Sequence, residues 1–468
     1  MQKYLFKNII LVSLFLLTRL INLYTAPPFV DELLYIRWTN TISSNPSHFL
    51  LPIYEDGQPP LYFWISSLIS RIASLEPLLI LRLISIMFGA LTLALLVKFG
   101  YLIHSRRLGD ILGYLYIFFP MFLWYDRLAM RESMITFAGT LLIYGLYLRF
   151  YKNKIAFGTQ LILFALLFGL LTKGTALLFV PVVTVVYLVA HANKRLHRYD
   201  YYSIGIILST LLLGFFYTKP IFIKSNSFLL DPRTVISHLY NNTYSTFSWL
   251  INYSTLPLII MWLWGVIKLF GKNRLLLFWT LGLFFMTVGI EIISAKIYFP
   301  RYFLWVMPLF LLPIGWGILE LSYHKIGKLI VLLSIIPVLR YDYFMLFNPL
   351  SAPLPTIEQW QYQTGWPSGY GIAELAKTMP DYPSDYLVVE KNEACRTGLD
   401  YHGATLPPLI DLTDTSLIKT ALSKGERINL CLAKDYPPSN FKTKLLKEIQ
   451  RPKAESSLRL YTLEDIYE

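Results

Sequence analysis

The sequence predicts an α-helical protein that crosses a membrane many times and ends in a small extracytoplasmic α/β domain. The first observation is composition: the 468 residues are 55% hydrophobic and only 15% charged, whereas soluble domains are about 25% charged. The second is that apolar runs long enough to span a bilayer recur from the N-terminus to about Arg340. The third is that charged residues become common after Tyr341, where apolar runs shorten to the length of strands.

Run length predicts about eleven membrane spans. The first run is longer than the apolar core of a signal peptide and lacks a small-residue cleavage site, so we expect it to be retained. The predicted spans cover residues 8–24, 78–102, 109–125, 133–150, 156–172, 175–191, 202–218, 255–270, 275–294, 303–321 and 327–341.

Basic clusters at every second exit from these spans predict the orientation of the chain. By the positive-inside rule, the loops that carry them are cytoplasmic, and so is the N-terminus. The clusters lie at 104–107, 149–154, 193–198, 272–274 and 324–328. We therefore expect a multi-pass protein of the plasma (inner) membrane whose other loops and C-terminal region are extracytoplasmic. Because much of the net charge of +13 sits in these clusters, we do not expect nucleic-acid binding.

Two domains are expected, a membrane domain over residues 1–340 and an extracytoplasmic α/β domain over 341–468. The first outer loop, residues 25–77, is too long for a simple connector. Its segments 32–42 and 61–72 have the amphipathic spacing of helices that lie in the membrane interface. Cys395 and Cys431 both fall in the second domain; the sequence does not decide whether they pair.

An acidic pair, Asp31 and Glu32, follows the first span at the predicted outer surface. A carboxylate at a membrane edge is costly to desolvate, which favours a chemical role. Acidic residues in a first helical turn also stabilise the helix dipole, so spacing alone leaves a structural role open. Glu55 and Asp56 form a second acidic pair before a rigid turn; they offer oxygen ligands to a divalent cation or serve only the turn.

Further charged residues gather on the same predicted face. Glu132 opens a span, where it either caps the helix or takes part in function. Arg127 and Arg131 precede it, and each either pairs with an acid or binds a lipid phosphate. Lys173 and Arg301 are outward basic residues at membrane depth that either grip a lipid phosphate or anchor the helix ends at the interface.

Taken together, these positions resemble the GT-C glycosyltransferases of family 39, which include protein O-mannosyltransferases and the aminoarabinose transferases of lipid A. The resemblance covers nearly the whole chain in the same order. It rests on Asp31-Glu32 with Tyr35, Gly57-Gln58-Pro59-Pro60 with Tyr62, Arg82 with Ser85, residues 127–132, Thr172-Lys173-Gly174, Pro300-Arg301-Tyr302 and the Trp-Pro-Ser-Gly-Tyr-Gly run at 366–371.

The resemblance implies a GT-C fold and transfer of a sugar from a polyprenyl-phosphate carrier to an acceptor hydroxyl at the outer face. Asp31 matches the family's catalytic base, which takes a proton from the acceptor during an inverting displacement. Glu132 matches a second acid that orients the acceptor or holds a metal. Lys173 and Arg301 are our candidates for stabilising the leaving phosphate.

The same resemblance assigns further residues to substrate binding. Many family members have a lysine where this chain has Gln58, so another cation is expected to meet the phosphate here. A divalent metal is the one cofactor that stays open, and the residues themselves offer Glu55 and Asp56 as its candidate ligands. The full set of predicted substrate-binding residues is Glu32, Tyr35, Gln58, Pro59, Pro60, Tyr62, Arg82, Arg127, Lys173, Arg301 and Tyr302.

Two other functions compete with the transferase. A transporter or flippase of lipid-linked sugars would place polar groups at the membrane midplane and often carries inverted repeats. Here the ionisable residues gather near span ends, and the sequence shows no repeat. A membrane scaffold would leave the charges of the first outer loop unexplained. The sugar, the acceptor (a lipid, a glycan or a protein) and the oligomeric state are not written in the sequence.

Overall fold

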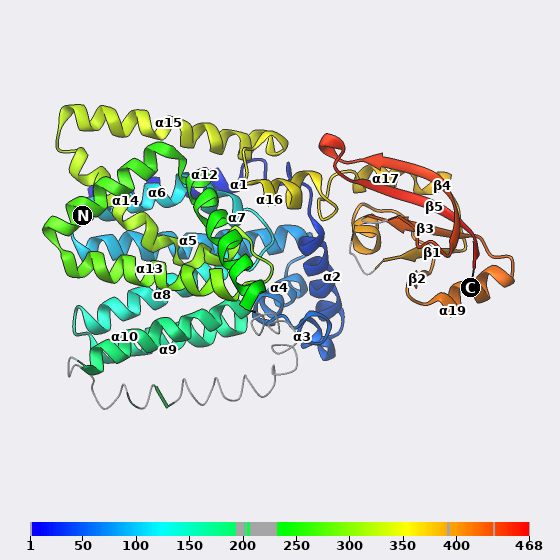
Figure 1. Cartoon of the computed structure of the whole chain (residues 1–468), viewed down its shortest axis with the longest axis horizontal. Helices are drawn as coiled ribbons and strands as arrows, with labels where there is room; N and C mark the ends of the chain where they lie inside the picture. Colours follow the sequence, from blue (N-terminus) through cyan, green and yellow to red (C-terminus); the bar gives the residue numbers. More distant parts are fainter. Residues whose placement is uncertain are drawn as a thin grey trace.

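The structure is a computed structural model that describes residues 2–192, 201, 204–205, 232–390, 394–433 and 436–467. A bundle of long helices forms one end of the molecule and a smaller sheet domain forms the other (Figure 1). Most of the apolar core lies inside the bundle, as expected for a chain whose apolar residues are concentrated before residue 341.

Eight helices in the described part of the chain are long and apolar enough to cross a membrane. Two shorter helices, α6 (Arg106–Phe118) and α7 (Pro120–Asp126), are apolar enough only as a pair, bent by 61°, which forms either a broken span or a re-entrant loop. The break falls at Pro120, because the residue before a proline is disfavoured in the helical conformation. The eight are α5 (Pro77–Ile103), α8 (Glu132–Phe150), α9 (Ile155–Thr172), α10 (Phe179–Ala192) with its leading turn η2 (Gly174–Leu178), α12 (Pro232–Lys272), α13 (Arg274–Ser294), α14 (Met307–Leu321) with η4 (Pro300–Val306), and α15 (Lys325–Phe347).

These helices confirm a membrane protein with many spans. A helix, α1 (Gln2–Leu20), lies at the first predicted span but is not among the eight. All of the predicted span 202–218 except residues 204–205 falls outside the described residues, and helices lie at all the other predicted positions. The total of eleven and the orientation therefore stay predictions.

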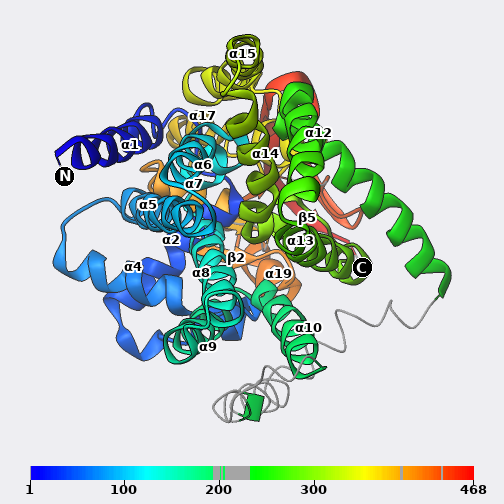
Figure 2. The ribbon, with the colours of Figure 1, turned by 90° about the vertical axis from the view of Figure 1, so that its left-hand side faces the viewer.

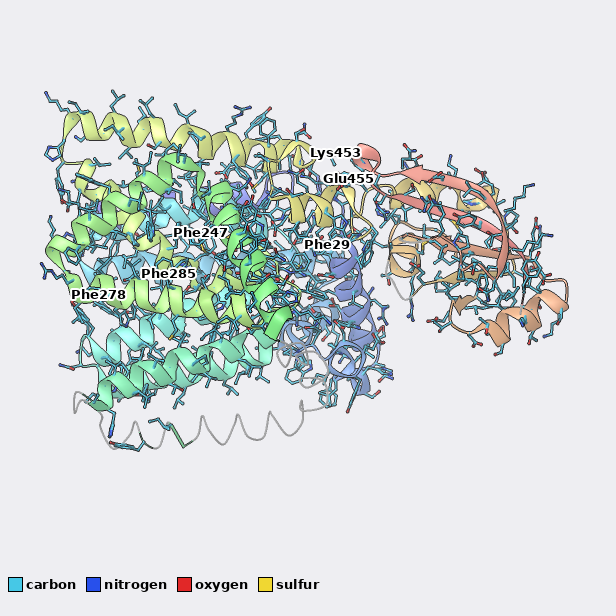
Figure 3. All side chains as sticks on the ribbon, in the orientation of Figure 1. Phe29, Phe247, Phe278, Phe285, Lys453 and Glu455 are labelled. Atoms are coloured by element: carbon cyan, nitrogen blue, oxygen red, sulfur yellow. A yellow bond between two sulfur atoms is a disulfide. The ribbon has the colours of Figure 1, made fainter. Side chains whose placement is uncertain are left out.

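The spans differ in how much of their surface the protein covers. In α8 and the η4–α14 span, 89% and 94% of the apolar window is buried, whereas in α10, α12 and α15 the share is 33%. Figure 2 views the bundle from its end, with α14 near the centre and α15 at the periphery. Outer helices expose large apolar side chains such as Phe247, Phe278 and Phe285 (Figure 3). This pattern is typical of lipid-facing helices around a protein core.

The first outer loop forms three helices, α2 (Val30–Ser44), α3 (Leu51–Asp56) and α4 (Leu61–Ile72). The two helices expected from amphipathic spacing at 32–42 and 61–72 are confirmed as α2 and α4. In Figure 1, α2 lies across the end of the bundle that faces the sheet domain. Its buried residues include Leu33, Tyr35 and Trp38, and the rings of Tyr35 and Trp38 pack against Phe63 of α4.

The C-terminal region contains the expected α/β fold. Its mixed five-stranded sheet has the order β2-β1-β3-β5-β4, with β1 parallel to β2 and β3, and β5 antiparallel to β3 and β4. Cys395 and Cys431 form a disulfide that joins the turn at 394–398 to β3. The elements are α16 (Thr356–Gln359), η6 (Trp360–Thr364), α17 (Ile372–Thr378), β1 (Tyr386–Val389), α18 (Leu399–Tyr401), β2 (Leu409–Asp411), α19 (Thr415–Ser423), β3 (Ile428–Leu432), β4 (Phe441–Gln450) and β5 (Ser457–Ile466).

The predicted domain boundary at residues 340/341 falls inside α15, which continues to Phe347. The segment that follows, residues 348–371, lies between the last span and the sheet domain. The division of the chain into two domains stays a prediction.

This connecting segment holds the beginning of α2. The amide of Val30 donates to the Pro367 carbonyl at 2.9 Å. The chain at Gly369 passes so close to Pro28 that a Cβ there would lie 2.2 Å from the Pro28 carbonyl oxygen, so only glycine fits. Phe29, which precedes α2, lies at the junction between the bundle and the sheet domain (Figure 3).

The sheet domain also forms hydrogen bonds with this connecting segment, residues 348–371. Lys453 donates to the side chain of Gln359 at 2.9 Å, and the Thr364 hydroxyl donates to Glu455. Figure 3 shows Lys453 and Glu455 at the end of the sheet domain nearest the bundle. The segment 348–371 therefore connects the α2 N-terminus on one side to the sheet domain on the other.

Candidate active site

The acidic pair lies in the first turn of α2, and its two carboxylates have different surroundings. Successive helical residues point about 100° apart. The side chain of Asp31 is 33% exposed, and its Oδ2 accepts a hydrogen bond from Arg301 Nη1 at 3.1 Å. The side chain of Glu32 is fully buried. Only Asp31 is therefore open to a substrate.

Both carboxylate oxygens of Glu32 accept hydrogen bonds from other groups of the protein. Arg82 donates from Nε and Nη2 to its two oxygens at 3.0 and 3.1 Å. The backbone amides of Phe29 and Ala129 donate to the same carboxylate at 3.3 and 2.6 Å. Glu32 thus connects the start of α2 to α5 and to the loop before α8. These contacts do not support its predicted role in substrate binding.

Beside Asp31, a second carboxylate and two cations form a cluster. Glu132 begins α8, and its Oε1 accepts a hydrogen bond from Lys173 Nζ at 2.7 Å. The Arg301 Nε lies 3.7 Å from the same oxygen, so Arg301 bridges Asp31 and Glu132. Lys173 also lies 5.3 Å from the centre of the Tyr302 ring. The structure therefore brings together both predicted catalytic acids and both predicted phosphate-binding cations.

A third cation, Arg131, lies next to this cluster. Its Nη2 donates to the Tyr35 hydroxyl at 2.9 Å and to the Gln58 side-chain carbonyl at 2.7 Å. Arg131 precedes Glu132 directly in the chain. The guanidinium of Arg131 therefore contacts Gln58, the position at which the resemblance implies a lysine. Arg131 is among the charged residues that the sequence marks but is not in the predicted substrate-binding set; its adjacency to Glu132 is the signal that the sequence offers.

Several other predicted binding residues direct their polar groups into the protein. Arg127 donates to the carbonyls of Thr18, Arg19, Ile21 and Asn22, at 2.7–3.1 Å, where α1 ends. Arg82 donates to the Leu23 and Ala26 carbonyls besides Glu32. The Tyr62 hydroxyl donates to the Leu81 carbonyl at 2.9 Å, and Pro59 and Pro60 lead into α4. Their assignment to substrate binding stays a prediction.

The predicted metal ligands are also engaged by neighbouring side chains. Glu55 accepts hydrogen bonds from both terminal nitrogens of Arg37 at 3.1 and 2.6 Å and from Trp38 Nε1 at 2.6 Å. Asp56 accepts one from Gln58 Nε2 at 2.8 Å. Within the described ranges no group of three or more His, Cys, Asp or Glu side chains is placed to hold a metal ion. Glu55 thus stabilises the first outer loop through Arg37, whatever its role toward a metal.

Sequence reasoning missed a buried acid behind the site, Glu358 of α16. Its carboxylate accepts hydrogen bonds from the hydroxyls of Tyr125 in α7 and Tyr253 in α12. Burial raises the pKa of Glu358 from 4.5 to about 7. No local motif marks this residue, because its two partners lie far away in the chain.

The raised pKa makes stability depend on pH. A carboxyl that holds its proton more tightly when folded stabilises the protein fully below the unfolded pKa of 4.5, and this contribution is lost as pH rises through about 7. We expect the melting temperature to fall over this window in the wild type and to fall less in Glu358→Gln. Thermal unfolding in detergent at a series of pH values measures both. Equal slopes in the two proteins would contradict the prediction.

The chain is similar to known proteins both by a family model and by fold. The family model described as dolichyl-phosphate-mannose-protein mannosyltransferase matches residues 47–228. ArnT from Cupriavidus metallidurans is similar in structure in its apo state, with a TM-score of 0.59, 10% identity, and coverage of 99% of this chain and 98% of that one. Its undecaprenyl phosphate complex gives a TM-score of 0.58 at 12% identity, with the same coverage.

A more distant match is the Archaeoglobus fulgidus oligosaccharyltransferase in its apo form, with a TM-score of 0.51 and 13% identity over 86% of this chain and 64% of that one. No curated protein matches by sequence. The predicted resemblance to GT-C glycosyltransferases of the family 39 type is confirmed, by the family model over residues 47–228 and by the fold over nearly the whole chain.

Proposed function

We propose that this membrane glycosyltransferase moves a sugar from a polyprenyl-phosphate carrier to an acceptor hydroxyl at the extracytoplasmic face. The observation that carries the proposal is the cluster in which Arg301 bridges the partly exposed Asp31 and the buried Glu132–Lys173 pair. The donor class is supported by the undecaprenyl phosphate bound to ArnT and the dolichol-phosphate in an AglB complex from Archaeoglobus fulgidus.

Asp31 would act as the general base. Its carboxylate takes the proton of the acceptor hydroxyl while that oxygen attacks the anomeric carbon. The bond between the anomeric carbon and the phosphate oxygen breaks in the same step, so the sugar is inverted and the lipid phosphate leaves. The 33% exposure of the Asp31 side chain gives the acceptor a route to the carboxylate.

The cations near Asp31 would stabilise the leaving phosphate. Three cations, Arg131, Lys173 and Arg301, face two acids, Asp31 and Glu132, which leaves a positive excess for an anion. Lys173 and Arg301 are buried except for 10% and 12% of their side chains. Charge-assisted hydrogen bonds are strong in such surroundings, because little water competes for the donors.

The orientation and acceptor belong to the same proposal. The basic loops would face the cytoplasm, which places α2, the site and the C-terminal domain outside. A polyprenyl-phosphate sugar would enter from the surrounding lipid, and the acceptor would be a hydroxyl of a lipid, a glycan or a protein. Glu132 would orient that acceptor from the N-terminal end of α8.

Turnover by the purified protein tests the proposal. Full-length protein in detergent is mixed with polyprenyl-phosphate sugars and candidate acceptors, and released polyprenyl phosphate is measured by mass spectrometry. We expect release in detergent, where no second compartment exists; a pure transporter would release none. We also expect a polyprenyl phosphate among the lipids that copurify. Absence of both release and copurified carrier would overturn the donor assignment.

A further inference from the structure

An apolar cleft opens between α8, α10 and α13, at the ends of these helices that lie away from the candidate site. Its volume is about 440 Å³. The helix α8 begins at Glu132 in the site and ends at Phe150 beside the cleft, a length of about 27 Å. Figure 3 shows Phe278, which lines the cleft, at the end of the bundle away from the sheet domain. The cleft is therefore separate from the proposed chemistry.

The lining of the cleft is suited to a hydrocarbon chain. Its side chains are apolar or aromatic, and it follows α13 from Leu275 to Met286, a rise of about 16 Å. One leaflet contributes about 15 Å to the hydrocarbon core of a bilayer. Gly282 lies on this wall, and a Cβ there would have no heavy atom within 4 Å. The glycine thus leaves a notch in α13 in which a chain can lie.

Two exposed cations, Lys152 and Arg274, lie at one end of the cleft. Asn273, directly before α13, donates to the hydroxyl of Tyr151, directly after α8, at 3.0 Å. Lys152 follows Tyr151 and Arg274 follows Asn273, so both cations adjoin this contact. The Nζ of Lys152 lies 5.8 Å from the centre of the Tyr147 ring, which lines the cleft. A hydrocarbon slot therefore ends at a basic surface.

We propose that the cleft holds an acyl chain of an anionic phospholipid whose headgroup binds Lys152 and Arg274. Among the described residues neither cation pairs with an acid, whereas the neighbouring Lys272 pairs with Glu320 at 2.8 Å. An anionic headgroup supplies the complementary charge, and the chain fills the notch at Gly282. With the orientation proposed above, this lipid belongs to the cytoplasmic leaflet, so it is neither the donor nor the acceptor.

The lipid would complete the packing of α10. Only 33% of the apolar window of the η2–α10 span is buried by protein. A chain in the cleft contacts α10 on one side and α8 and α13 on the other. Because a ligand that binds only the folded protein stabilises it, the lipid should raise the melting temperature.

Delipidated full-length protein in detergent tests the inference. The probe is dioleoyl phosphatidylglycerol, and dioleoyl phosphatidylcholine is its zwitterionic counterpart with the same chains. Native mass spectrometry measures binding, and thermal unfolding measures stability. Two basic residues beside an anionic headgroup favour it by about thirtyfold, so we expect phosphatidylglycerol to bind more tightly by about this factor and to raise the melting temperature further. Equal affinity for the two lipids would overturn the inference.

Gly282→Leu tests the position of the chain. The new side chain enters the open space of the cleft, and leucine favours a helix over glycine, so the variant should be at least as stable as the wild type. Loss of about two buried methylenes lowers affinity about tenfold, and we expect a drop at least this large for phosphatidylglycerol. Unchanged binding would contradict the inference.

Gly289→Leu is the matched control. Gly289 lies about two turns further along α13, and a Cβ there also has no heavy atom within 4 Å, but this residue does not line the cleft. We expect this variant to bind phosphatidylglycerol as the wild type does. A loss as large as that of Gly282→Leu would place the lipid outside the cleft.

The double variant Lys152→Gln with Arg274→Gln tests the headgroup. Both side chains are exposed, so the fold should be kept while the affinity for phosphatidylglycerol falls to that for phosphatidylcholine. Lys325→Gln with Lys328→Gln removes two exposed cations at the start of α15, away from the cleft, and should keep the preference. A preference that survives in the first double variant overturns the assignment.

Undecaprenyl phosphate as a competitor separates this lipid from the donor carrier. We expect no displacement of phosphatidylglycerol, because the carrier phosphate is proposed to bind at the other end of the bundle. Displacement, together with weaker carrier binding in Gly282→Leu, would assign the cleft to the polyprenyl tail and overturn the inference. Turnover of a lipid-linked sugar is a separate measurement, so the proposed function can fail while this inference stands.

Discussion

Replacing Asp31 with asparagine is expected to lower turnover of a polyprenyl-phosphate sugar by about 10²–10⁴-fold, the loss typical of a general base. Asparagine keeps the size of the side chain and a carbonyl oxygen that can still accept the hydrogen bond from Arg301. It cannot take the acceptor proton at neutral pH. Single-turnover release of polyprenyl phosphate from the saturated enzyme measures the chemical step.

Binding and stability serve as controls for this variant. Because Asp31 is partly exposed and lies at the edge of the cluster, Asp31→Asn should keep a melting temperature and an affinity for undecaprenyl phosphate close to those of the wild type. Turnover near the wild-type rate would show that another group accepts the proton. A large loss of affinity without a loss of rate at saturation would assign Asp31 to binding.

Replacing the neighbouring Glu32 with alanine should instead destabilise the fold by about 3–5 kcal/mol. The change leaves the Arg82 guanidinium, which is 1% exposed, without its anion, and it removes the acceptor for two backbone amides. Thermal or denaturant unfolding in detergent measures the loss. The two variants of this adjacent acidic pair should therefore differ in what they lose: Asp31→Asn should lose turnover, and Glu32→Ala should lose stability.

An exposed ion pair provides the comparison for Glu32. Glu464 pairs with Lys442 at 3.5 Å, with side chains 42% and 55% exposed. Glu464→Ala should change stability by about 1 kcal/mol or less. If Glu32→Ala were as mild, the buried pair with Arg82 would not be holding α2 in place. A double variant, Glu32→Gln with Arg82→Met, should recover part of the loss, since no unpaired charge remains.

The fold was predictable to the extent that it depends on local pattern. Run length alone located the membrane helices, because the thickness of the bilayer sets the length of each apolar segment. Amphipathic spacing located α2 and α4 in the same way. The break at Pro120 was not predicted, because we treated residues 109–125 as one apolar run although a proline interrupts it.

Only part of the candidate site was predictable from the residues that match the family pattern. The resemblance named Asp31, Glu132, Lys173 and Arg301, which the structure brings together. It also named Arg127, whose guanidinium donates to carbonyls more than 100 positions away in the chain; its role in substrate binding stays a prediction. A motif does not distinguish a residue that holds the scaffold from one that meets the substrate, because both depend on tertiary contacts.

Glu358 was missed for the same physical reason. Tyr125 lies 233 positions from Glu358, and no local periodicity encodes such a contact. The signal that remained in the sequence was the Trp-Pro-Ser-Gly-Tyr-Gly run, which we assigned to the outer domain. In the structure its Pro367 and Gly369 contact the residues just before α2.

The contact between Gly369 and Pro28 limits where the outer domain of this chain can be exchanged for that of a related protein. A chimera joined at the end of the last span would pair one protein's α2 with another's connecting segment. Any side chain at position 369 would then meet the Pro28 carbonyl. A graft that transfers a new outer domain should therefore keep residues 348–371 with their own membrane bundle and make the junction after Gly371.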